Sequence, residues 1–124
     1  MARILIVNDE KDIATICSFV LEPAGYKVDF AHGGLAGVEA AQHLKPDLVI
    51  LDWILPDATG EDVLRKLRSS EATARIPVVL MSAIPDIELQ AKKLGVQGVL
   101  PKPFDMDSLL ERVSTAMANK RAVA

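Results

Sequence analysis

Four side chains able to do chemistry stand directly after short apolar runs of the sequence. Asp9 follows ILIV and Asn8, and Asp52 follows LVIL without an intervening residue. Ser82 follows VVLM, and Lys102 follows the run Val96–Leu100 and Pro101. Two carboxylates, a hydroxyl and an ammonium are groups that bind cations and phosphoryl oxygens. Their repeated placement after apolar runs predicts one polar site.

The two carboxylates are suited to Mg²⁺, which is usually held by one or two acids and keeps several of its waters. If the strands that end before Asp9 and Asp52 are neighbours, the strand spacing of about 4.8 Å lets both acids share one cation. The Ser82 hydroxyl and the Lys102 ammonium suit the oxygens of a phosphoryl group. This pattern predicts an acceptor site for phosphoryl transfer, with the Asp52 carboxylate as the nucleophile.

These side chains meet only if the fold sets the apolar runs side by side. Five runs have the composition of strands, namely Ile4–Val7, Val28–Phe30, Leu48–Leu51, Val78–Met81 and Val96–Leu100. Five segments with helical spacing of apolar residues alternate with them. This alternation predicts an α/β fold, a doubly wound five-stranded parallel sheet of order 2-1-3-4-5, flavodoxin-like (βα)5. Ligands bind beyond the carboxyl ends of such strands, where the four side chains stand.

Turn and capping residues agree with these elements. Gly33-Gly34 opens the second helix, Gly95 ends the fourth, and Thr59 with Asp62 is typical of a helix N-cap. We expect residues 1–119 to form one domain and residues 120–124 to form a flexible tail.

Composition limits the kinds of partner. The chain has 124 residues, a net charge of -3 and a pI of about 5.3, which disfavours direct nucleic-acid binding because no basic footprint exists. No apolar stretch reaches the length of a membrane span, and the N-terminus lacks a signal-peptide layout, so we expect a soluble, cytoplasmic protein without membrane contact. The single cysteine, Cys17, has the spacing of a buried helix face and is interpreted as a core residue.

The motifs ILIVNDE, LDWILPDATG, LMSA and LPKPF, in this order and spacing, resemble the receiver domain of two-component response regulators. The resemblance covers essentially the whole chain. It is strongest to a stand-alone receiver of the chemotaxis-regulator type, and a fragment of a larger regulator is equally compatible. It implies that Asp52 is the phosphoacceptor, that Asp9 binds Mg²⁺ directly and that Ile54 offers the metal its main-chain carbonyl.

The resemblance also implies roles for the other flank of the site. Ser82 and Lys102 would contact the phosphoryl group, the main-chain N–H of Ala83 would be accessible to it, and Lys102-Pro103 would be a cis peptide. The phosphoryl donor would be a sensor histidine kinase or a histidine phosphotransfer protein. The output partner is not specified, and the surface of the fourth helix, fifth strand and fifth helix is a candidate homodimer interface.

Two positions depart from the family's usual pattern. Asn8 stands where a second acid is usual, which weakens the attraction for a metal, although its amide oxygen can hold a metal-bound water. Val99, three residues before Lys102, stands where an aromatic residue is usual. The second departure concerns transmission of a signal rather than chemistry.

Each residue also has an ordinary structural interpretation. Asp9 could cap the helix that begins near Glu10, and Asp52 could be a turn residue at the end of a strand. Ser82 and Lys102 could be solvated loop residues. Four such coincidences at four strand ends disfavour that joint interpretation. Trp53 could shape access to the site or only cover its rim. The two histidines, His32 and His43, are expected on the surface, away from the site.

The same residues discriminate between rival functions. A receiver-like interaction module that no longer depends on phosphorylation would explain Asn8 and Val99, but it would not need the acids, hydroxyl and lysine. A dehalogenase-type phosphatase needs a second acid two residues after its nucleophile, and Ile54 cannot act as an acid or base. A flavodoxin-like redox protein needs a hydroxyl- and glycine-rich phosphate loop, where this chain has NDEK.

Overall fold

The structure is a computed structural model and describes residues 2–123. Within that range, five parallel strands alternate with five helices. The strands are β1 (Arg3–Val7), β2 (Lys27–Ala31), β3 (Leu48–Asp52), β4 (Val78–Ser82) and β5 (Gly98–Pro101). The helices are α1 (Lys11–Leu21), α2 (Gly34–Leu44), α3 (Gly60–Arg68), α4 (Ile87–Leu94) and α5 (Met106–Val123). The strand order β2-β1-β3-β4-β5 confirms the predicted doubly wound fold.

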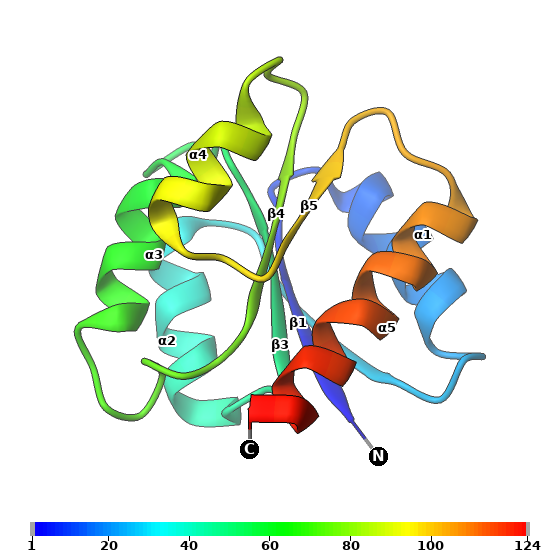
Figure 1. Ribbon diagram of the computed structural model, residues 1–124, viewed down its shortest axis with the longest axis horizontal. Helices are drawn as coiled ribbons and strands as arrows, with labels where there is room; N and C mark the ends of the chain where they lie inside the picture. The colour runs from blue at the N-terminus through cyan, green and yellow to red at the C-terminus, as the bar shows by residue number, and fades with distance from the viewer. Residues whose placement is uncertain (1, 124) are drawn as a thin grey trace.

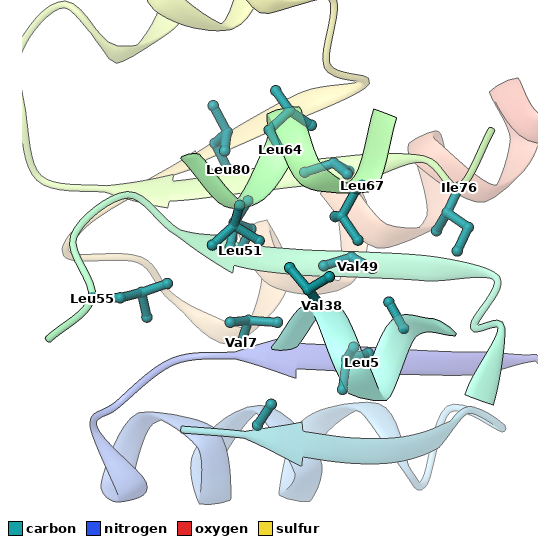
Figure 2. Packing of buried hydrophobic residues seen from close by; sticks show 14 of the residues in the cluster. Leu5, Val7, Val38, Val49, Leu51, Leu55, Leu64, Leu67, Ile76 and Leu80 are labelled. Atoms are coloured by element: carbon teal, nitrogen blue, oxygen red, sulfur yellow. The ribbon is translucent and has the colours of Figure 1, made fainter. Parts of the chain in front are cut away.

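Helices cover both faces of the sheet. Figure 1 shows α2, α3 and α4 on one face and α1 with α5 on the other. Every residue of β3 and β4 is therefore buried, as expected for parallel strands covered on two sides. Side chains alternate between two separate cores: Leu5 and Val7 of β1 belong to one, and Ile4 and Ile6 to the other. Figure 2 shows the first core, in which strand residues pack against helix residues such as Val38 and Leu67.

The residues predicted to begin or end helices are found at the helix ends. Gly33 is the N-cap of α2, and Gly95 adopts a left-handed conformation (φ 69°) at the C-cap of α4. Thr59 and Asp62 form a capping box before α3: Thr59 Oγ1 accepts from the Asp62 N–H, and Asp62 Oδ2 accepts from the Thr59 N–H. The start of α3, and with it the end of the preceding loop, is fixed by these two bonds.

The strand ends lie within one residue of the predicted ones, except at the start of β5. β5 begins at Gly98 rather than at Val96, because the Val96 N–H donates to the Ala91 carbonyl in the turn that closes α4. The described helix α5 ends at Val123 and so includes residues 120–123, whose flexibility as a tail stays a prediction. Ala124 lies outside the described residues.

Cys17 is fully buried in the core beneath α1 and α5, which confirms its interpretation as a core residue. Burial raises the pKa of its thiol to about 11, so the thiol is protonated at neutral pH. Among the described helices, none combines the length and apolar character that crossing a bilayer requires.

Candidate functional site

The carboxyl ends of β1, β3, β4 and β5 meet at a cavity of about 280 Å³. The parallel register sets Asp52 beside Met81 and Ser82 beside Pro101, so residues that follow neighbouring strands reach the same edge of the sheet. The cavity is lined by Asp9, Glu10, Asp52, Trp53, Ile54, Ser82, Ala83, Ile84 and Lys102. The sheet thus brings together every predicted site residue except Asn8.

Asp52 lines this cavity and has only 4% of its surface exposed. Lys102 Nζ donates to both carboxylate oxygens, at 3.3 Å from Oδ1 and 3.2 Å from Oδ2, and the Ile54 N–H donates to Oδ1 at 3.5 Å. Burial raises the pKa of Asp52 above its usual value; Lys102 opposes that shift, and Asp9 adds to it. The outcome is a buried carboxylate with a single adjacent ammonium.

Lys102 is held in place by its backbone and by a second acid. Its N–H donates to the Ser82 carbonyl at 2.8 Å, and the Lys102-Pro103 peptide is cis, as the resemblance implied. Its ammonium also lies 3.7 Å from Glu10 Oε1. The ammonium therefore sits between two carboxylates, a buried one on β3 and a half-exposed one before α1.

Ser82 is buried, and its hydroxyl oxygen accepts from the Ile84 N–H at 3.1 Å. That bond leaves the hydroxyl hydrogen free to donate to another acceptor. Ala83 is exposed beside it at the cavity wall. The two residues provide the hydroxyl and the small side chain that the sequence pattern predicted at this flank.

Asn8 lies behind the cavity instead of at its surface. It is 1% exposed, its Oδ1 accepts from the Glu10 N–H at 2.8 Å, and its Nδ2 donates to Met81 Sδ at 3.5 Å. Its side chain thus organises the turn into α1. Asp9 is exposed and faces the cavity, and the N-cap of α1 is Glu10, so the alternative interpretation of Asp9 as a helix cap is wrong.

The donor set of the cavity fits a hard divalent cation. Asp9 and Asp52 present carboxylate oxygens to one small cavity that Ile54 also lines, and Mg²⁺ is held by few protein oxygens plus water. The described residues hold no group of three or more His, Cys, Asp or Glu side chains with metal-binding geometry. A cation here would rest on two acids and main-chain oxygen.

Trp53 lies at the cavity, whereas the two histidines lie outside it. Trp53 is half-buried at the cavity wall, and its carbonyl accepts from the Gly60 N–H at 2.6 Å. His32 and His43 are exposed and do not line the cavity, as predicted. His32 stacks on Phe30, and its Nδ1 lies 3.2 Å from the Asn8 carbonyl oxygen.

Sequence reasoning missed Glu10 and Ile84 as cavity residues. Glu10 directly follows Asp9, which was a usable signal, but its ion pair with Lys102 joins residues far apart in the chain. Ile84 contributes a backbone N–H to Ser82, a role that its apolar side chain does not reveal.

The fold and the site together define a class: doubly wound α/β proteins with a carboxylate-lined cavity at the carboxyl edge of the sheet. A sequence model of the response regulator receiver domain matches residues 4–114. The chain belongs to the response regulator receiver domain family, which is a family of signalling domains in two-component systems.

Individual relatives agree with this assignment. The chain is 42% identical over 115 residues to the DNA-binding dual master transcriptional regulator RpaA of Synechocystis sp., covering 91% of this chain and 48% of that protein. It is 41% identical over 123 residues to the transcriptional regulatory protein CusR of Escherichia coli, covering 98% and 53%. The chain therefore spans about half the length of these curated relatives.

Among solved structures, the fold is similar to the chemotaxis protein CheY4 of Vibrio cholerae. The TM-score is 0.86 at 29% identity, and the match covers 94% of this chain and 98% of that one.

Proposed function

We propose that this receiver domain accepts a phosphoryl group on Asp52 from a phosphohistidine donor, in a Mg²⁺-dependent reaction, and regulates a partner by conformational change. The observation that carries the proposal is the buried Asp52 carboxylate, held 3.2–3.3 Å from Lys102 Nζ in a cavity that also contains Asp9 and Ser82. A structural ion pair alone would not require the second acid and the hydroxyl at the same edge.

The proposed step is a phosphoryl transfer. A carboxylate oxygen of Asp52 forms the new P–O bond while the P–N bond of the phosphohistidine breaks, and the electron pair of that bond stays on the imidazole. Lys102 would stabilise charge on the phosphoryl oxygens, and the Ser82 hydroxyl and the Ala83 N–H would donate to them. The ion pair with Lys102 favours the ionised form of Asp52, which is the nucleophile.

In this proposal Asp9, Asp52 and the main-chain carbonyl of Ile54 hold the Mg²⁺, which supplies positive charge against the phosphoryl oxygens when bound. Asn8 was expected to contribute through a water. The Asn8 Oδ1 already accepts from the Glu10 N–H, so one lone pair of this oxygen remains for a metal-bound water.

The phosphoryl donor in this proposal is a sensor histidine kinase or a histidine phosphotransfer protein in the cytoplasm. The domain acts as a signalling element that assists its own phosphorylation and dephosphorylation rather than as an enzyme on a separate substrate. Its output partner would bind a different surface of the domain, for which the candidate is the surface formed by α4, β5 and α5. The same surface is the candidate homodimer interface.

A second candidate function is a phosphorylation-independent interaction module. Two observations favour it: the Asn8 side chain is hydrogen-bonded to Met81 and to the Glu10 N–H, and Val99 is packed in the core where an aromatic switch residue is usual.

Intact mass spectrometry separates the two functions. The chain is incubated with acetyl phosphate with and without Mg²⁺, and the phosphoacceptor function predicts the mass gain of one phosphoryl group only with Mg²⁺. Asp52→Asn should abolish the gain. Equal modification of the variant would overturn the assignment of Asp52, and no gain in the native chain would favour the interaction module.

A further inference from the structure

One carboxylate outside the cavity ties the loop after β3 to the start of another helix. Asp57 Oδ1 accepts from the Gly34 N–H at 2.7 Å, and its Oδ2 accepts from the Leu35 N–H at 3.1 Å. Such N–H groups in the first turn of a helix have no partner within the helix. The N-cap of α2 is Gly33, which has no side chain to satisfy them. Asp57, from a distant part of the chain, takes that role.

The loop after β3 approaches the start of α2 closely because positions 33 and 34 carry no side chain. A Cβ on Gly34 would lie 2.8 Å from Ala58 Cβ and 2.9 Å from Val63 Cγ2, and a Cβ on Gly33 would lie 3.2 Å from Asp57 Oδ1. The glycine pair therefore has a second use besides opening α2: it lets the loop pack against the helix end.

The loop that Asp57 anchors is closed on itself. The Leu55 N–H donates to the Ala58 carbonyl at 3.0 Å, Ile54 forms an isolated bridge with Thr59, and the Gly60 N–H donates to the Trp53 carbonyl. These bonds tie the two sides of the loop to each other. The attachment of the loop at Asp57 therefore restrains where its first residues lie at the cavity wall.

We propose that Asp57 is a positioning residue that fixes the backbone of Trp53 and Ile54 at the cavity by holding the β3–α3 loop to the N-terminus of α2. Its carboxylate is also favourably placed at the positive end of the helix dipole. The backbone hydrogen bonds from Gly34 and Leu35 hold its pKa below the usual range, so the contact is charged at neutral pH. The consequence for cation binding rests on the proposed function, in which Ile54 offers its carbonyl.

The test compares three variants of the full chain. Asp57→Ala removes both hydrogen bonds, and Asp57→Asn removes the same charge but keeps an oxygen acceptor. Thr73→Val is the control for stability loss. Thr73 lies in the loop between α3 and β4, away from the strand ends that form the cavity, and the substitution removes the buried hydrogen bond that its hydroxyl donates to the Leu67 carbonyl of α3. Amide hydrogen exchange is measured without metal, and Mg²⁺ affinity is measured by Trp53 fluorescence.

Asp57→Ala should speed exchange at Leu55 and Gly60 about tenfold, although neither amide bonds to Asp57, and should weaken Mg²⁺ binding about fivefold. Asp57→Asn should fall between Asp57→Ala and the native chain, and Thr73→Val should change neither quantity. The proposal would be overturned if the Leu55 and Gly60 amides exchanged as slowly in Asp57→Ala as in the native chain. It would also be overturned if Thr73→Val sped their exchange as much as Asp57→Ala does. If the native chain binds no Mg²⁺, the proposed function fails instead, and the exchange data alone decide the role of Asp57.

Discussion

Asp52 combines deep burial with a charge, and this combination has a cost for folding. Burial raises the pKa of Asp52 in the folded chain above its unfolded value, so the folded state holds that proton more tightly. Stability from this group is therefore complete at pH values below the unfolded pKa and is lost as the pH rises through the folded pKa. At neutral pH the ionised carboxylate opposes folding.

We accordingly expect Asp52→Asn to raise the melting temperature of the metal-free chain at pH 7 by a few degrees. The gain should shrink as the pH falls through the acid range, where the native carboxyl becomes protonated. Calorimetry at several pH values in the presence of a chelator measures this. A variant that melts lower than the native chain at pH 7 would mean that the ion pair with Lys102 outweighs the burial.

At position 8, a substitution that favours Mg²⁺ binding through its charge is expected to lower stability through its burial. Asn8→Asp adds a charge near the two site acids and keeps an acceptor for the Glu10 N–H, so we expect Mg²⁺ binding about tenfold tighter by fluorescence titration. The same carboxylate is buried and loses the bond to Met81, so the metal-free variant should be less stable.

Thr15→Asp serves as a control, because it adds the same charge at an exposed position of α1. Unchanged or weaker Mg²⁺ affinity in Asn8→Asp would show that position 8 does not contribute to the field at the metal.

At the scale of elements, the close packing of α2 on β1 depends on a glycine inside the helix. Ala at position 37 would improve helix propensity by about 1 kcal/mol, but its Cβ would lie 2.8 Å from Val7 Cγ1 and 2.9 Å from Val7 Cγ2. Because both atoms belong to the core, we expect Gly37→Ala to destabilise the chain by about 1–3 kcal/mol in urea denaturation.

The double variant with Val7→Ala checks the cause of that loss. Removing the Val7 methyl groups should recover part of the cost, giving a favourable coupling energy between the two substitutions. If the stability losses of the two single variants simply add in the double variant, contact with Val7 is not the cause of the loss in Gly37→Ala.

The elements also show what a sequence can and cannot predict. The strands followed from β-branched apolar runs, and the Thr59–Asp62 capping box from local spacing, because both signals are contained within a few residues. The position of Asn8 did not follow, because its amide is oriented by Met81, 73 residues away. The same holds for Glu10, whose partner Lys102 comes from the last strand end, and for Asp57, whose partners open α2.

At the scale of the whole molecule, Val99 bears on how a change at the site reaches the surface formed by α4, β5 and α5. It is 6% exposed and belongs to the same core as Ile87 and Ala91 of α4. A β-branched side chain has essentially one χ1 choice and too little reach to alternate between buried and exposed positions. We therefore expect the response to phosphorylation to be concentrated in residues 82–86 and α4.

Nuclear magnetic resonance with and without beryllofluoride tests this expectation. In the native chain the chemical-shift changes should be largest in residues 82–86 and α4, and in Val99→Tyr they should extend to β5 and α5, because an aromatic ring provides two alternative positions. Equal changes in β5 and α5 of both proteins would rule out position 99 as the limiting residue.

The two cores on opposite faces of the sheet have a further consequence. The sheet separates the two cores, so a change of side-chain volume in one core is opposed first by the close-packed residues of that core. The carboxyl edge is where residues of both come together: Trp53 and Ile84 pack against one, Ile13 and Phe104 against the other. A change of charge at Asp52 therefore occurs at an edge of the sheet that residues of both cores share, so it can act on the helices of either face.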